Sequence, residues 1–127
     1  MKILVVDDDA PARQSLEVLL DLNGFAVQLA ASPEEALAQI DPLEIPDVIV
    51  SDFDMPGLNG VEFLEQATDQ IAALGCPAPG RILLTGAMDL ELPEDSQGEY
   101  RVVSKSNESA ELLRVIQTLR QHSASAE

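Results

Sequence analysis

The sequence predicts an α/β fold in which helices cover both faces of a doubly wound, five-stranded parallel sheet. Three observations support this prediction. Apolar runs of strand length alternate with segments of helical periodicity, turn signals separate these segments, and the 127 residues suffice for one domain with a single packed core. Strands and helices that alternate in this way form right-handed crossovers between parallel strands, which place helices on both faces of one sheet.

Five apolar runs supply the predicted strands: residues 2–6, 25–30, 46–51, 81–85 and 100–104. Four segments with apolar side chains at helical spacing supply the predicted helices: residues 10–23, 33–41, 60–74 and 111–120. The first helix ends at Asn23-Gly24, a common stop signal. Ser32 can cap the second helix, with Glu35 completing a capping box.

The segment between the fourth and fifth strands departs from this alternation. A helix is expected there, but Pro93 lies in its middle, and its second half is acidic and ends at Gly98. Proline in a helix interior costs about 3 kcal/mol, so at most a turn or two can form on either side. The sequence therefore predicts that the helix expected at residues 86–98 is short or missing.

The acidity of the chain limits its partners. Its 23 acidic and 7 basic residues give a formal net charge of −16. Because nucleic acids and anionic membranes are themselves negative, we expect direct binding to neither. The single cysteine, Cys76, can form no internal disulfide and fits a reducing compartment. No apolar run reaches transmembrane length and the start lacks a signal-peptide pattern, so we expect a cytoplasmic protein.

Polar residues that can carry chemistry follow four of the predicted strands. Asp7-Asp8-Asp9 follows the first strand, and Asp52 and Asp54 follow the third. Thr85 and Lys105 close the fourth and fifth. The carboxyl ends of parallel strands meet at one edge of the sheet, so these side chains are predicted to converge. Carboxylates packed together repel each other unless a cation lies among them, and oxygen ligands of this kind suit Mg²⁺.

Four segments, in this order and at these intervals, resemble the receiver domain of two-component response regulators, with a likeness to chemotaxis regulators. They are residues 3–9, 51–60, 84–86 and 103–105. The resemblance runs over nearly the whole chain and implies a receiver domain over residues 1–122, with a frayed tail at residues 123–127. It also implies the flavodoxin-like strand order 2-1-3-4-5.

The resemblance implies roles for the acidic residues that follow the first and third predicted strands. Asp52 matches the phosphoacceptor, whose carboxylate attacks a phosphoryl donor and forms an aspartyl phosphate. Asp7 and Asp8, together with Asp52 and the backbone carbonyl of Asp54, match the residues that hold Mg²⁺ or Mn²⁺. Asp8 would be a direct ligand, while Asp7 would act mainly through water. Asp9 is more simply a charge near the first helix N-terminus, where the helix dipole favours it.

Residues at the ends of the fourth and fifth strands match the groups that bind the phosphoryl group. Thr85 matches the hydroxyl that donates a hydrogen bond to a phosphoryl oxygen and moves toward it in the active state. Lys105 matches the lysine that pairs with Asp52 before phosphorylation and with the phosphoryl group afterwards. The side chains of Asp54 and Ala87 occupy the positions at which the family adjusts the lifetime of the phosphoryl group.

Two residues depart from the family pattern. Ser106 replaces the proline that usually follows the lysine, and a cis bond before a residue other than proline costs about 2.5–4 kcal/mol. Val102 stands where many receivers carry an aromatic switch residue that responds to the hydroxyl of Thr85. With the short helix at residues 86–98, these departures predict that phosphorylation orders or displaces that segment rather than rotating a ring.

Three functions remain open at this point. The leading hypothesis is a signalling module, not an enzyme, that takes a phosphoryl group from a histidine kinase or a phosphotransfer protein. Its output would be a downstream protein effector or an attached output domain, with a weak homodimer as a further option. The first alternative is a pseudo-receiver that binds partners without phosphorylation. The second reads residues 52–54 as the Asp-x-Asp motif of a haloacid-dehalogenase-like phosphohydrolase.

Overall fold

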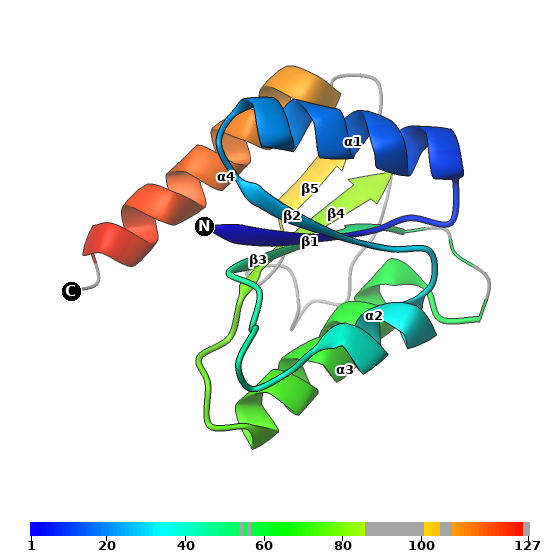
Figure 1. Cartoon of the computed structure of the whole chain (residues 1–127), viewed down its shortest axis with the longest axis vertical. Helices are drawn as coiled ribbons and strands as arrows, with labels where there is room; N and C mark the ends of the chain where they lie inside the picture. The colour runs from blue at the N-terminus through cyan, green and yellow to red at the C-terminus, as the bar shows by residue number, and fades with distance from the viewer. Residues whose placement is uncertain (54, 56, 86–100, 105–107, 126–127) are drawn as a thin grey trace.

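The computed structural model is a three-layer α/β sandwich around one parallel sheet, and it describes residues 1–53, 55, 57–85, 101–104 and 108–125 (Figure 1). Its strands are β1 (Lys2–Val6), β2 (Ala26–Ala30), β3 (Val48–Asp52), β4 (Gly80–Thr85) and β5 (Arg101–Ser104). They lie in the order β2-β1-β3-β4-β5, and all four neighbouring pairs are parallel. The predicted fold class and strand order are therefore confirmed.

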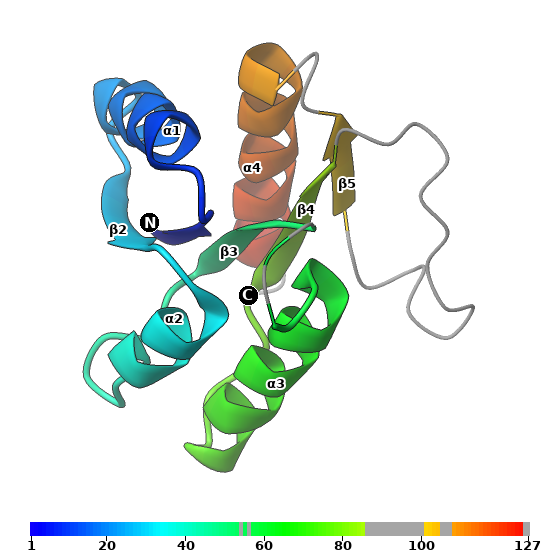
Figure 2. The same ribbon diagram turned by 90° about the vertical axis from the view of Figure 1, so that its right-hand side faces the viewer.

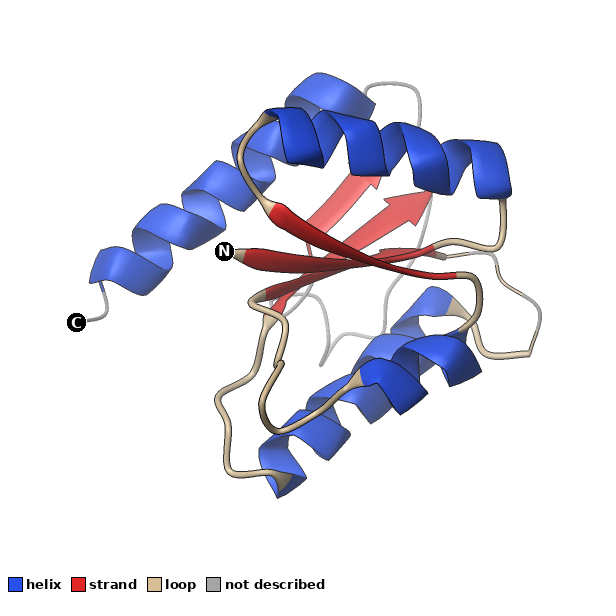
Figure 3. Ribbon diagram, in the orientation of Figure 1, coloured by secondary structure: helices blue, strands red, loops and turns tan. Residues whose placement is uncertain are grey.

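Four helices in the described part of the chain cover the two faces of the sheet: α1 (Ala10–Leu22), α2 (Pro33–Gln39), α3 (Gly60–Ala73) and α4 (Glu108–Ser125). Helices α1 and α4 lie on one face, and α2 and α3 lie on the other (Figures 2 and 3). Because every neighbouring pair of strands is parallel, the carboxyl ends of all five strands point toward the same edge.

Successive side chains of a strand point to opposite faces of the sheet, so the hydrophobic core is divided between these two faces. In β1, Ile3 and Val5 pack with the α1 and α4 side, whereas Leu4 and Val6 pack with the α2 and α3 side. All four side chains are at most 1% exposed. A parallel strand that is covered on both faces must be apolar on both, so the run of apolar residues in β1 follows from its central place in the sheet.

Helix boundaries agree with the predicted ones to within two residues, except near the two ends of α4. The sequence predicts a last helix over residues 111–120, whereas α4 begins three residues earlier and continues to Ser125. Fraying of residues 123–127 concerns motion and stays a prediction. The short helix expected at residues 86–98 lies outside the described residues, as do Ser106 and its peptide bond.

The predicted capping box at the start of α2 forms only in part within the described residues. The backbone N–H of Glu35 donates to Ser32 Oγ at 3.1 Å, as expected of an N-cap. The Glu35 carboxylate, however, accepts a hydrogen bond from Gln39 Nε2 at 3.4 Å, one turn further along the helix. A complete box occurs instead at α3, between Asn59 and Glu62.

No helix in the described ranges combines the length and the apolar composition that crossing a bilayer requires.

Candidate functional site

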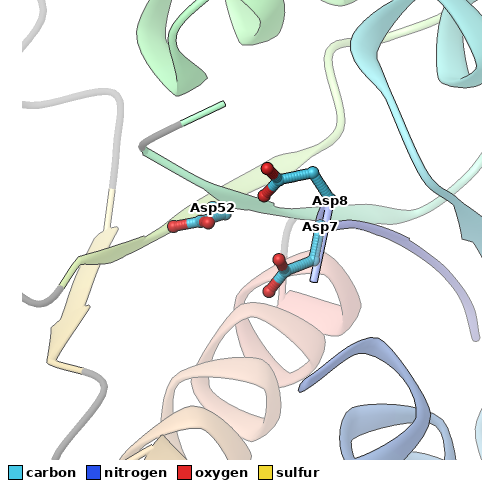
Figure 4. Close-up of side chains that lie close together, drawn as sticks. All are labelled: Asp7, Asp8 and Asp52. Atoms are coloured by element: carbon cyan, nitrogen blue, oxygen red, sulfur yellow. The ribbon is translucent and has the colours of Figure 1, made fainter. Parts of the chain in front are cut away.

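The two central strands bring three carboxylates together at the carboxyl edge of the sheet. Val6 of β1 pairs with Ser51 of β3, so the residues that follow them, Asp7 and Asp52, lie at neighbouring strand ends. Asp8 extends this group, and one carboxylate oxygen of each of the three residues lies within 4.8 Å of the others. Figure 4 shows the three side chains extending in the same general direction. We call Asp7, Asp8 and Asp52 the acidic cluster.

Burial differs sharply within the acidic cluster. The side chains of Asp7 and Asp52 are almost completely buried, with exposed fractions of 1% and 3%, whereas Asp8 is exposed. Buried carboxylates need hydrogen bonds or a cation to offset the loss of water. The cluster therefore combines two acids fixed in the protein interior with one that faces solvent.

The backbone around Asp52 is fixed by β4 and by the start of α3. The N–H of Phe53 donates to the carbonyl of Leu84 at 2.9 Å, which extends the β3–β4 ladder by one residue. The hydroxyl of Ser51 donates to the Asp52 carbonyl at 3.0 Å. The N–H of Gly60, the first residue of α3, donates to the Phe53 carbonyl at 2.9 Å. These bonds hold the two peptide groups that follow Asp52.

Asp7 begins the β1–α1 loop and is held through its N–H, its carboxylate and its carbonyl. Its N–H donates to the Ala30 carbonyl at 3.2 Å, which ties it to the end of β2. Its Oδ1 accepts from the N–H of Asp9 at 2.9 Å. Its carbonyl oxygen accepts from Arg13 Nη1 at 2.7 Å. The loop therefore folds back on the first turn of α1.

Asp9 is the N-cap of α1. Its Oδ2 accepts a hydrogen bond from the N–H of Ala12 at 3.2 Å, and Pro11 occupies the first turn, where its missing N–H does no harm. The sequence indicates a favourable charge at this helix end, and the structure gives Asp9 the more specific role of an N-cap.

The remaining predicted site residues divide into described and undescribed positions. Thr85 is the last residue of β4 and is buried, one position beyond Leu84, which pairs with Asp52. Val102 lies in the edge strand β5, pairs with Leu83 and is 40% exposed. The predicted roles of Asp54, Ala87 and Lys105 fall outside the residues that the structure describes.

The donor set of the acidic cluster fits a hard divalent cation. All three side chains offer carboxylate oxygens, and these are the ligands that Mg²⁺ and Mn²⁺ prefer in proteins. Mg²⁺ commonly keeps several of its waters, so a cluster with one solvent-facing carboxylate suits it better than a closed cage would.

Two residues that contact the backbone of the acidic cluster are not among the site residues predicted from the sequence. Arg13 contacts the Asp7 carbonyl, and Gly60 packs against the Asp52 backbone, where a Cβ atom would lie 2.7 Å from the Asp52 carbonyl oxygen. The one available signal for Arg13 is that it is the sole basic residue between positions 10 and 22. The signal for Gly60 is a glycine directly after a helix N-cap.

Comparisons with known proteins agree with this geometry. The sequence matches the family described as "Response regulator receiver domain" over residues 3–117. The transcriptional regulatory protein FixJ of Rhizobium meliloti is 32% identical over 125 residues, which cover 97% of this chain and 58% of FixJ. The chain thus spans somewhat more than half the length of that relative.

Solved structures give the same assignment. The chemotaxis protein CheY4 of Vibrio cholerae is 30% identical, with a TM-score of 0.75 and coverage of 93% of this chain and 97% of that one. The response regulator TrrA of Thermotoga maritima, solved in complex with Mg²⁺-BeF, is 28% identical with a TM-score of 0.73 and the same coverage. This chain, with its five-stranded sheet and its carboxylates at the carboxyl edge, belongs to the response regulator receiver domain family.

Proposed function

We propose that the chain receives a phosphoryl group on Asp52, with a divalent cation held by the acidic cluster. The observation that carries the proposal is the approach of three carboxylates from β1 and β3 to within 4.8 Å of one another. Mg²⁺ or Mn²⁺ would be held by Asp7, Asp8, Asp52 and the backbone carbonyl of Asp54. When bound, the cation supplies charge neutralisation for the transferring phosphoryl group.

In the proposed reaction, an oxygen of the Asp52 carboxylate attacks the phosphorus of a phosphohistidine. The new O–P bond forms as the P–N bond breaks, and the departing imidazole nitrogen takes up a proton. Asp52 ends a paired strand, and the two peptide groups that follow it are held by hydrogen bonds. The nucleophile is therefore already positioned before the reaction, which lowers the entropic cost of bringing the reactants into line. Thr85 and Lys105 would donate hydrogen bonds to the phosphoryl oxygens.

The partners follow from this proposal. The donor would be a histidine kinase or a phosphotransfer protein, and the recipient of the signal a protein effector or an attached output domain. We place these encounters in the cytoplasm and propose that the chain acts as a signalling module rather than an enzyme. The family match gives no support to the pseudo-receiver alternative or to a dehalogenase-like phosphohydrolase.

Intact-mass analysis after incubation with acetyl phosphate and Mg²⁺ tests the proposal. The wild-type chain should gain the mass of one phosphoryl group, and the gain should disappear in Asp52→Asn and when Mg²⁺ is removed with a chelator. Asp69→Asn is the matched control, because it makes the same chemical change at an exposed position of α3. An unchanged wild-type mass, with Mg²⁺ binding shown separately, would contradict the proposal and favour the pseudo-receiver.

A further inference from the structure

The position of the Asp8 carboxylate depends on its backbone. Asp8 is exposed, and its carboxylate makes no hydrogen bond within the described ranges of the chain. Asp7, by contrast, is buried and is held through its N–H, its carboxylate and its carbonyl. The peptide group between Asp7 and Asp8 therefore sets the direction in which the Asp8 side chain leaves the loop.

Arg13 holds the oxygen of that same peptide group. Its Nη1 donates to the Asp7 carbonyl at 2.7 Å, a short bond from a charged donor. Arg13 itself belongs to an ordered helical turn, because its N–H donates to the Asp9 carbonyl at 3.0 Å and the Asp9 side chain caps the helix. The guanidinium thus connects the first turn of α1 to the peptide that orients Asp8.

We infer that Arg13 is a positioning residue for the divalent cation, acting through the Asp7–Asp8 peptide rather than by contact with the metal. The inference rests on the proposed function, because it assigns to Arg13 the orientation of two of the cation's expected ligands. Groups that orient metal ligands in this way contribute to metal affinity even though they do not touch the metal.

The charge of Arg13 and its hydrogen bond predict opposite effects on cation binding. A positive charge near the acidic cluster repels a divalent cation, so removing the charge alone should strengthen binding. Removing the hydrogen bond releases the peptide and allows the Asp8 carboxylate to leave the cluster, so it should weaken binding. The sign of the change therefore separates a positioning residue from a solvated surface charge.

Titration of the ¹⁵N-labelled chain with MgCl₂ at constant ionic strength, followed by amide chemical shifts, provides this test. Arg13→Met keeps an unbranched apolar stem and removes both the charge and the donors of the side chain. It should raise the Mg²⁺ dissociation constant by about 10-fold, the lower end of the range for groups that orient metal ligands. Arg13→Lys keeps the charge and one donor nitrogen, and its dissociation constant should fall between those of wild type and Arg13→Met.

Phosphorylation by acetyl phosphate supplies a second readout that a loosened fold would not reproduce. In Arg13→Met, the Mg²⁺ concentration for half-maximal phosphorylation should rise, while the rate at saturating Mg²⁺ should stay close to that of wild type. A general loss of structure would lower both. Arg114→Met is the matched control, because Arg114 is an exposed arginine of α4.

Two failures can be told apart. If the wild-type chain neither binds Mg²⁺ nor accepts a phosphoryl group, the proposed function fails. If the wild-type chain does both, and Arg13→Met is folded by circular dichroism and binds Mg²⁺ as tightly as wild type or more tightly, the positioning role of Arg13 is overturned. If Arg13→Met does not fold, Arg13→Gln takes its place, because glutamine also lacks the charge and is too short to keep the bond to the Asp7 carbonyl: a dissociation constant equal to or below that of wild type refutes the role.

Discussion

Gly60 shows how one residue connects a helix to the proposed phosphoacceptor. A Cβ atom at this position would lie 2.7 Å from the Asp52 carbonyl oxygen, 2.7 Å from Leu83 Cδ2 and 3.0 Å from Phe53 Cα. Two of these three neighbours are backbone atoms, which cannot rotate away as the end of a side chain can. A side chain at position 60 would therefore displace either α3 or the peptide that carries Asp52.

We predict that Gly60→Ala lowers the free energy of unfolding by about 1–3 kcal/mol, the usual effect of overpacking. This loss should occur although alanine is the better helix former. The rate of phosphorylation by acetyl phosphate should fall as well, because the change displaces the Asp52 backbone. Urea denaturation and intact-mass time courses measure the two effects.

Gly24→Ala is the comparison for Gly60→Ala. Gly24 has a φ of +85°, so alanine there is strained, but apart from its chain neighbours nothing lies within 4 Å of its Cβ position. Its substitution should lower stability by about 1–2 kcal/mol through the backbone alone and leave the phosphorylation rate unchanged. A Gly60→Ala variant as stable and as reactive as wild type would show that α3 can shift without consequence.

Residues of the candidate site could be predicted from the sequence where their position depends on the strands alone. Asp7, Asp8 and Asp52 directly follow or end apolar runs, and parallel pairing of β1 with β3 is enough to bring them together. Arg13 and Gly60 could not be predicted in the same way. Their contacts depend on the path of a loop and on how closely a helix approaches the sheet, and hydrophobic periodicity determines neither.

The N-terminus of α3 lies beside Asp52 and is closed by a capping box. The Asn59 side chain accepts from the N–H of Glu62 at 2.9 Å, and the Glu62 carboxylate accepts from the N–H of Asn59 at 3.1 Å. This reciprocal pair satisfies two N–H groups that the helix itself cannot satisfy. It fixes the residue that immediately precedes Gly60.

We predict that Asn59→Ala lowers the free energy of unfolding by about 0.5–2 kcal/mol, the usual effect of losing an N-cap. Asn59→Asp keeps the acceptor oxygen and places a negative charge at the helix N-terminus, so its stability should remain close to that of wild type. Urea denaturation of the three proteins compares them directly. Equal transition midpoints for Asn59→Ala and wild type would show that the capping box contributes nothing measurable.

Element boundaries could be predicted from the sequence where a strong local signal marks them. Asn23-Gly24 stops α1, and Gly24 adopts the positive φ that favours glycine. The length of α4 could not be predicted, because its last residues carry no helix stop signal and the apolar spacing ends near Leu119. Ser32 and Glu35 have the spacing of a capping box, but the Glu35 side chain accepts a hydrogen bond from Gln39 instead.

At the scale of the whole molecule, the net charge of −16 opposes the compact state, and the acidic cluster concentrates part of that repulsion at one edge of the sheet. Asp8 lies beside two buried carboxylates and makes no compensating side-chain hydrogen bond in the described part of the chain. A bound cation would relieve this local repulsion, whereas monovalent salt screens the molecule as a whole.

We predict that Asp8→Ala raises the unfolding temperature in the absence of Mg²⁺ and reduces the stabilisation that Mg²⁺ provides. Without Mg²⁺, the variant should unfold at a higher temperature than wild type, because one of three neighbouring negative charges is removed. With Mg²⁺, wild type should gain more than the variant, because a ligand that binds only the folded state stabilises it by about 2.7 kcal/mol at 100 times its dissociation constant. Thermal unfolding across an MgCl₂ titration, with NaCl matched for ionic strength, measures both effects. Asp69→Ala removes the same charge from the exposed surface of α3 and should keep the full response to Mg²⁺. An equal gain for wild type and Asp8→Ala would place the cation's effect outside the acidic cluster.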